Sequence, residues 1–233
     1  MQGHTRIDSL IGPPRSTLRL FKMLAKTAFF GGYLGLRKAL LGVNSDRSAA
    51  VSNHWARSVL RTLGVQVQVY GRCPDDATIL VGNHRSYLDI PLMVAARPCA
   101  FLAKREVASW PLLGQCAVAA GTVFVKRGDK QSQNRARQAL QRRAERGEVV
   151  ALFPEGTTFA GPGMLPMRPG AFRIAAQAQV TVAPVAIVYA ERRAAYVVGD
   201  TFLSHFLRLF QSRRLRAHVS FGPSLADSDS ERL

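Results

Sequence analysis

A histidine and an aspartate that could share a proton lie within the segment NHRSYLD (83–89). The segment directly follows the apolar run ILVG (79–82), which is typical of a buried strand, and the ends of strands are where α/β sheets carry their sites. A carboxylate bonded to one imidazole nitrogen fixes the tautomer and stabilises the imidazolium, so that the other nitrogen can act as a general base. His84 and Asp89 are therefore candidate catalytic residues.

The same spacing also has a structural interpretation. We expect a helix to begin near Ser86, and Ser86-x-x-Asp89 then matches a capping box in which Asp89 bonds only backbone amides. The spacing alone favours neither interpretation. Because no GxSxG elbow is present, a base at His84 would act on a hydroxyl that the substrate brings.

Two further polar groups follow apolar segments, in FVKRG (124–128) and FPEGTT (153–158). The backbone amides of Gly156 and Thr157, with Arg127 nearby, could hold a phosphate. Each signal is weak alone, because a strand ending in two cations is usually a solvated edge and a Pro-Glu-Gly turn is usually only a turn. VAPVAI (182–187) is typical of a buried strand whose proline shapes a wall of the site.

The elements that would position these residues alternate between strands and helices, which predicts an α/β fold, a mixed sheet flanked by helices. Strands are expected at 65–70, 77–82, 99–103, 122–125, 149–153, 180–189, 195–199 and 216–221. Helices are expected at 15–41 with an interruption at Gly31-Gly32, and at 45–63, 86–96, 110–120, 131–147 and 202–211. We therefore divide the chain into N-terminal helices (1–63), an α/β domain (64–222) and a loose polar tail (223–233).

The segment 107–125 carries no charged residue and is long enough to span a bilayer. It contains Pro111, Gly114 and Gly121, and it ends in the β-rich letters TVFV. A short helix followed by a buried strand therefore describes it better than a membrane span.

The composition is strongly basic, with 32 Lys and Arg against 15 Asp and Glu in 233 residues and a net charge of +17. Such an excess indicates a polyanionic partner, either nucleic acid or an anionic membrane surface. Residues 1–62 are basic and amphipathic, as in helices that lie in a lipid interface, although two ordinary helices packed on a core would look similar. The three cysteines form no CxxC pair, which argues against a disulfide framework and a zinc site.

Taken together, NHRSYLD, FVKRG, FPEGTT and VAPVAI, in this order and spacing, resemble the 1-acyl-glycerol-3-phosphate acyltransferase family of lysophospholipid acyltransferases. The resemblance covers about residues 50–222 and includes KREVASWPLLGQ (104–115). It implies acyl transfer from an acyl thioester, carried by coenzyme A or acyl carrier protein, to a lysolipid hydroxyl. It also implies an α/β domain seated on the membrane by N-terminal helices, as a peripheral or monotopic protein at the cytoplasmic face.

The resemblance also implies roles for single residues. His84 would deprotonate the acceptor hydroxyl and Asp89 would orient it, with no covalent enzyme intermediate. The candidate substrate-binding residues are Arg127, Glu155, Gly156 and Thr157, which match positions that bind the acceptor's phosphate region, together with Asn83 and Lys126. The sequence departs from the family at Thr158, where many members have arginine, so one phosphate-binding cation is missing.

The implied scheme requires no metal and no cofactor other than the acyl donor. The preferred acceptor is 1-acyl-sn-glycerol-3-phosphate, and the departure at Thr158 leaves room for another lysolipid such as a lyso-ornithine lipid. Two other classes stay open: a non-catalytic membrane-binding module and a nucleic-acid-binding protein. The sequence lacks both a recognition-helix motif and the aromatic and basic interleaving of RNA-binding proteins, so we expect no nucleic-acid partner. His4, His54, His205 and His218 have no partner pattern and are expected to fill core or surface.

Overall fold

The computed structural model describes residues 14–42, 45–110, 113–197, 199–227 and 229. Within them the strands are β1 (Val65–Tyr70), β2 (Ala77–Gly82), β3 (Ala100–Lys104), β4 (Val123–Val125), β5 (Val150–Leu152), β6 (Thr181–Tyr189) and β7 (Leu215–Phe221). The α-helices are α1 (Arg15–Leu41), α2 (Ser45–Leu63), α3 (Asp89–Ala96), α4 (Leu113–Ala119), α5 (Lys130–Glu145), α6 (Gly170–Ala178) and α7 (Phe202–Leu209). Two 3-10 helices are η1 (Arg105–Ser109) and η2 (Arg192–Ala194).

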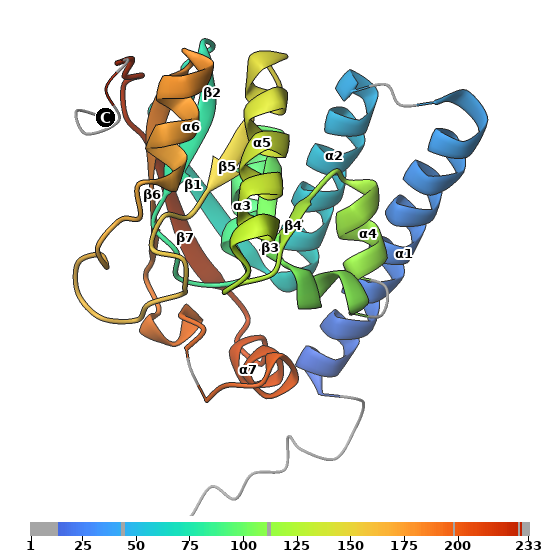
Figure 1. The fold of residues 1–233 in the computed structure, drawn as a ribbon. Helices are drawn as coiled ribbons and strands as arrows, with labels where there is room; N and C mark the ends of the chain where they lie inside the picture. The colour runs from blue at the N-terminus through green and yellow to red at the C-terminus, as the bar shows by residue number, and fades with distance from the viewer. Residues whose placement is uncertain (1–13, 43–44, 111–112, 198, 228, 230–233) are drawn as a thin grey trace, which may run out of the picture.

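The strands form one mixed sheet in the order β1-β7-β6-β2-β5-β3-β4 (Figure 1). β6, β2, β5, β3 and β4 are parallel, whereas β7 is antiparallel to β6 and β1 pairs parallel with β7. β2 lies between β6 and β5, with Val81 opposite both Leu152 and Pro184. The segments that follow β2 and β5 therefore leave the sheet at the same edge, beside the end of β6.

Helices cover the sheet on both faces, which confirms the predicted α/β class. On one face Ile79 of β2 belongs to a buried cluster with Leu140 of α5 and Ile174 of α6. On the other face Leu80 belongs to a larger cluster with Leu92 of α3 and further residues of α2 and α7. Because neighbouring β2 residues point to opposite faces and both faces are covered, the strand is a continuous apolar run.

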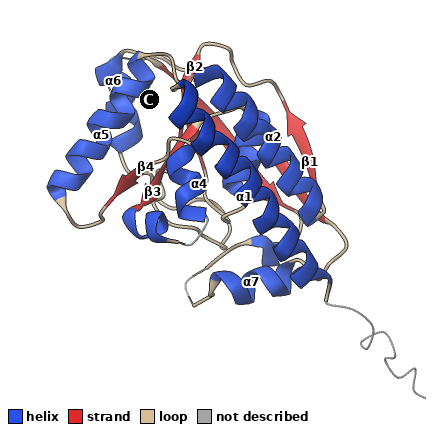
Figure 2. Cartoon of the chain, turned by 90° about the vertical axis from the view of Figure 1, so that its right-hand side faces the viewer, coloured by secondary structure: helices blue, strands red, loops and turns tan. Residues whose placement is uncertain are grey.

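The N-terminal helices α1 and α2 lie side by side (Figure 2). Both contribute to the buried cluster that contains Leu92 of α3. The start of α1 is tied to the segment before β7, because Arg19 donates hydrogen bonds to the carbonyls of Phe210, Ser212 and Arg213. Farther along, Lys26 donates to Ser58 of α2 at 2.6 Å. Part of the basic charge predicted for the lipid surface is thus used within the fold.

The predicted interruption of the first helix at Gly31-Gly32 is wrong, because α1 is continuous from Arg15 to Leu41. Gly31 lies where α1 crosses α4: a Cβ atom there would stand 2.2 Å from Sγ of Cys116. At Gly32 no atom lies within 4 Å of the corresponding position. Glycine at 31 therefore permits a close helix contact and does not break the helix.

Other differences concern loops and element starts. The strand predicted at 195–199 is wrong over its described residues: Tyr196 donates its amide to the Arg85 carbonyl, and its ring packs against Tyr87. α6 was not predicted, and α3 begins at Asp89 after a turn over the preceding residues. The beginning of the polar tail is paired, because Leu225 exchanges two backbone hydrogen bonds with Val182.

The uncharged segment 107–125 is divided among η1, α4 and β4, as expected for a helix followed by a strand. Across the described residues, no helix combines the length and the apolar character needed to cross a bilayer.

Candidate active site

β2 delivers Asn83 and His84 to the edge where the parallel strands end. The side chain of Asn83 continues the pairing of β2 with β6: its Nδ2 donates to the Ile187 carbonyl at 2.9 Å, and its Oδ1 accepts from the Ile187 amide at 2.7 Å. Asn83 is buried, and both ends of its amide are thereby used. Asn83 therefore holds the end of β2 against β6, and the substrate-binding role expected of it stays a prediction.

His84 and Asp89 form a direct pair, with Nδ1 of His84 2.7 Å from Oδ2 of Asp89. A carboxylate only accepts hydrogen bonds, so Nδ1 carries the proton and Nε2 has a free lone pair. The His84 side chain is 20% exposed, whereas that of Asp89 is fully buried. The imidazole of the pair is therefore partly accessible to solvent, whereas its carboxylate is not.

The Asp89 carboxylate also bonds backbone amides, as the capping interpretation requires. Oδ2 accepts from the amides of Arg85 at 2.6 Å and Ser86 at 2.9 Å, while Oδ1 accepts from the hydroxyl of Tyr189 at 2.6 Å. Only the Asp89 half of the capping box is present, because Ser86 Oγ has no hydrogen-bond partner among the described residues and α3 begins at Asp89 without a side-chain cap. Asp89 also contacts His84 and Tyr189, so it does not bond backbone amides alone. A buried carboxylate is tolerated when donors surround it, and here four donors do so.

Tyr189 contributes to the pair from the end of β6. Burial raises the pKa of Tyr189 well above its ordinary value, and the neighbouring Asp89 charge raises it further. Its hydroxyl consequently stays protonated and donates to the carboxylate. The Asp89 charge is thus shared between a tyrosine and the imidazole that it orients.

The FPEG turn after β5 holds the imidazole in place. The ring of Phe153 stacks on that of His84 with a centroid distance of 4.2 Å and an interplanar angle of 8°. Glu155 is 3% exposed, and its two oxygens accept from the amides of His84 at 3.0 Å and Leu165 at 3.2 Å. Glu155 therefore joins the loop after β2 to the loop before α6, and its carboxylate faces backbone donors.

Arg85 holds the segment that follows the FPEG turn. Its guanidinium donates to the carbonyls of Phe159, Gly161 and Gly163, and it lies over the Phe159 ring at 5.6 Å. The Phe159 amide in turn donates to the His84 carbonyl at 3.0 Å. The charge of Arg85 is thus used to shape the loop beside His84.

The remaining predicted residues surround the same turn. Gly156 adopts a left-handed φ of 70°, and its carbonyl accepts a hydrogen bond from Arg127. Burial and a nearby arginine lower the pKa of Arg127. Thr157 is exposed next to Gly156, and Lys126 is exposed at the end of β4, where its amide donates to Ser132. The structure therefore brings FVKRG to FPEG, as the substrate-binding prediction requires.

Sequence reasoning missed Tyr189 and Arg85. Tyr189 ends a correctly predicted strand, but nothing in the local pattern marks its contact with a carboxylate 100 residues earlier. Arg85 lies inside the motif itself, where a cation beside a candidate base was a signal that the interpretation did not use. The whole arrangement can accept a proton at Nε2 and stabilise the resulting imidazolium through Asp89.

Comparisons with known proteins agree with this geometry. A family model described as Acyltransferase matches residues 65–188, more than half of the chain. A lyso-ornithine lipid O-acyltransferase of Pseudomonas aeruginosa is 33% identical over 207 residues, covering 86% of this chain and 80% of that protein. A 1-acyl-sn-glycerol-3-phosphate acyltransferase of Neisseria meningitidis is 34% identical over 187 residues, covering 77% of this chain and 73% of that protein.

One solved structure has the same fold. The 1-acyl-sn-glycerophosphate (LPA) acyltransferase PlsC from Thermotoga maritima aligns with a TM-score of 0.70 and 21% identity. The alignment covers 91% of this chain and 84% of that one, so the likeness extends well beyond the matched motifs.

Proposed function

Since the chain belongs to the acyltransferase family, we propose that it transfers a fatty acyl chain from an acyl thioester to the free hydroxyl of a lysolipid. The preferred acceptor is 1-acyl-sn-glycerol-3-phosphate, which would give phosphatidic acid. The alternative acceptor is a lyso-ornithine lipid, because relatives of both names match the chain over most of its length. The observation that carries the proposal is the 2.7 Å contact between His84 and Asp89, which leaves Nε2 as a base.

The proposed reaction is a direct transfer. Nε2 of His84 removes the proton of the acceptor hydroxyl as its oxygen attacks the thioester carbonyl carbon. The C–O bond forms, the C–S bond breaks, and the imidazolium returns the proton to the departing thiolate. Asp89 stabilises the imidazolium during this step.

The test uses the purified full-length chain with labelled acyl-CoA or acyl-acyl carrier protein and a panel of lysolipids. Mass spectrometry of the products identifies acceptor and donor in one experiment. We expect one acylated lysolipid to accumulate with the wild type and not with His84→Ala. Vesicle binding without transfer to any lysolipid would instead support the non-catalytic membrane module.

We further propose that α1 seats the protein on an anionic membrane surface. Apolar side chains that are 44–72% exposed follow one another along α1 at helical spacing, namely Leu18, Phe21, Phe29, Tyr33, Leu36 and Leu40. Exposed apolar surface of this kind is typical of an interfacial helix. The net charge of +17 adds attraction to anionic lipid.

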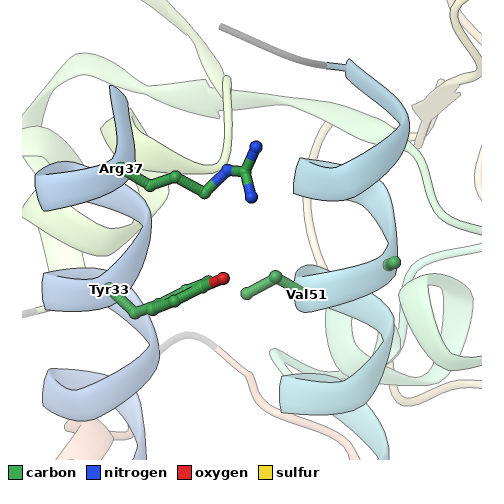
Figure 3. A pocket seen from close by; sticks show the side chains of 4 residues that line it. Tyr33, Arg37 and Val51 are labelled. Carbon is green, nitrogen blue, oxygen red and sulfur yellow. The ribbon is translucent and has the colours of Figure 1, made fainter. Parts of the chain in front are cut away.

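A groove between the two N-terminal helices also supports a membrane contact through α1. It is open and lined by Tyr33 and Arg37 of α1 and by Ala50 and Val51 of α2 (Figure 3). Tyr33 and Arg37 point across the groove toward α2. A cation beside the apolar residues of α1 suits a lipid headgroup, with the acyl chains against the helix.

Flotation with vesicles of phosphatidylcholine and phosphatidylglycerol tests this surface. Phe21→Asp combined with Phe29→Asp places charge on side chains that are 70% exposed, so we expect vesicle binding to fall while the fold is kept. Val69→Asp is the matched control, since Val69 is 50% exposed but lies on the edge strand β1. Equal binding by all variants would reject α1 as the membrane surface.

A further inference from the structure

Two arginines meet at the Gly156 turn, although only one was predicted there. Arg127 reaches the turn from the loop after β4 and donates to the Gly156 carbonyl. Arg168 reaches it from the loop before α6: a Cβ atom at Gly156 would lie 2.9 Å from Cζ and 3.0 Å from Nε of Arg168. A side chain at position 156 would therefore collide with the Arg168 guanidinium, and glycine leaves the room that this guanidinium occupies.

The backbone of Arg168 is fixed relative to the same turn. Its amide donates to the Pro154 carbonyl at 3.1 Å. Arg168 is followed by Pro169, the N-cap residue of α6, which offers no side-chain cap, and the first turn of α6 has no acidic residue. The partial positive charge at the start of α6 is thus not offset by its own capping residues.

The two guanidiniums share one region. The Glu106 charge acts on Arg127, but it offsets the effects of burial and of Arg168 only in part. No ion pair among the described residues includes Arg127 or Arg168. Both side chains are exposed, and the nearby Arg168 charge adds to burial in lowering the pKa of Arg127. Like charges held close together repel, and an anion bound between them would remove that repulsion.

The third arginine near this loop is already used. The Arg85 guanidinium donates to three backbone carbonyls at 159, 161 and 163, which leaves it little capacity for a ligand. Thr158, at the position where the family often has arginine, is uncharged. Arg127 and Arg168 are therefore the cations that this turn offers to solvent.

We propose that Arg127 and Arg168 together bind a phosphate monoester on the acceptor lipid, so that Arg168 supplies the positive charge that Thr158 lacks. This inference rests on the proposed acyl transfer and specifies its acceptor class. A phosphate monoester carries nearly two negative charges and three terminal oxygens, which suits two guanidinium forks. The headgroup of an ornithine lipid offers a single carboxylate together with a protonated amine. Two arginines would repel the positive charge of that amine.

The test compares three acceptors that have the same acyl chain: a lysophosphatidic acid, a lyso-ornithine lipid and a monoacylglycerol, which has no anionic group. The variants are Arg168→Ala and Arg168→Lys. Arg173→Ala is the matched control, because Arg173 is an exposed arginine of α6 and no hydrogen bond or ion pair of its side chain is seen among the described residues. Values of kcat and KM are measured for each pair of variant and acceptor.

We expect Arg168→Ala to raise KM for lysophosphatidic acid by on the order of 10-fold or more with little change in kcat, because uniform binding is lost. KM for monoacylglycerol should stay within about twofold, and Arg173→Ala should match the wild type. For Arg168→Lys we expect a KM for lysophosphatidic acid between those of the wild type and Arg168→Ala, since lysine keeps the positive charge but lacks the two parallel N–H donors of a guanidinium.

Three outcomes would overturn the inference. An unchanged KM for lysophosphatidic acid would remove Arg168 from binding. An equal rise in KM for monoacylglycerol would make its role structural. A wild type that acylates lyso-ornithine lipid but not lysophosphatidic acid would reject the phosphate class and keep the proposed transfer. Only a wild type that acylates none of the lysolipids would reject the transfer itself.

Discussion

The Tyr189 hydroxyl donates a 2.6 Å hydrogen bond to Oδ1 of Asp89, while Oδ2 of the same carboxylate faces His84. The two oxygens thus bind groups from different parts of the sheet. Because the carboxylate is fixed at both oxygens, it cannot rotate away from the imidazole. Orientation of the proposed base therefore depends on β6 as well as on the motif that follows β2.

Tyr189→Phe tests this dependence with little change of shape. We expect the free energy of unfolding to fall by about 1–3 kcal/mol, because a hydrogen bond to a buried charge is lost. We also expect kcat to fall while KM is nearly kept. Urea unfolding and steady-state kinetics measure the two effects, with Tyr70→Phe, an exposed tyrosine on β1, as control. Full activity in Tyr189→Phe would show that the motif alone orients His84.

His84→Ala should reduce turnover by about 10²- to 10⁴-fold, which is the usual size of general-base catalysis. Since His84 is only partly buried, the folded state should persist, and circular dichroism checks this. Near-normal turnover in a folded variant would remove His84 from the proposed role.

Asp89→Asn separates the two roles of the carboxylate. The amide oxygen can still accept from backbone amides, but it no longer stabilises an imidazolium, so turnover should fall severely. Turnover and thermal stability are measured on the same sample. If stability drops while turnover is kept, Asp89 serves only as a cap.

Gly31→Ala and Gly32→Ala form a matched pair on α1. Alanine at 31 would overlap Sγ of Cys116, so we expect a loss of about 1–3 kcal/mol in the free energy of unfolding. Alanine at 32 meets no atom within 4 Å and should stabilise the helix by about 0.5–1 kcal/mol. Urea unfolding of both variants gives the comparison, and equal effects would contradict the close contact between α1 and α4.

His205 makes the stability depend on pH. It is buried: Nδ1 accepts from the Tyr87 hydroxyl, and Nε2 donates to the carbonyls of Arg193 and Ala195. Burial lowers the pKa of His205, which the backbone carbonyls and Asp200 partly oppose. The unfolded chain therefore binds more protons than the folded one just below the ordinary value of about 6.5.

It follows that the contribution of neutral His205 is present above about pH 6.5 and is lost as the pH falls through that value. For the wild type, we expect the urea midpoint of unfolding to decrease as the pH is lowered from 8 to 5. We expect a smaller decrease for His205→Gln, and the same decrease as in the wild type for His54→Gln, which replaces an exposed histidine. Identical pH profiles for all three proteins would contradict the prediction.

The strands were predictable because their signals are local. ATILVG is apolar throughout since both faces of β2 are covered, and VQVQVY on the edge strand β1 alternates. α6 was not predicted because neither of its ends carries the usual sequence signal. It begins after Pro169 without a capping side chain, and its C-cap is Gln179, which has a φ of 51° where a glycine would be expected. Tyr196 and Val197 lie in no strand, because the Tyr196 amide instead donates to the carbonyl of Arg85.

The contact between His84 and Asp89 was predictable, and the residues around it were less so. His84 and Asp89 are neighbours in sequence, so spacing was enough to bring them together. Tyr189 contacts Asp89 only through the order of strands in the sheet, and Arg168 returns to the Gly156 turn only through the fold of the loop before α6, neither of which local patterns encode. For the same reason, burial of the Glu155 carboxylate against two loop amides could not be read from the letters FPEG.

The position of β2 between β5 and β6 has a consequence during synthesis on the ribosome. The His84 motif emerges early, yet Glu155 and Tyr189 follow it by 71 and 100 residues. A nascent chain that ends before β6 lacks the Tyr189 contact to Asp89, so, with His84 as the proposed base, we expect it to transfer acyl groups poorly. Acyl transfer by ribosome-bound chains of increasing length would therefore report when the central strands have joined.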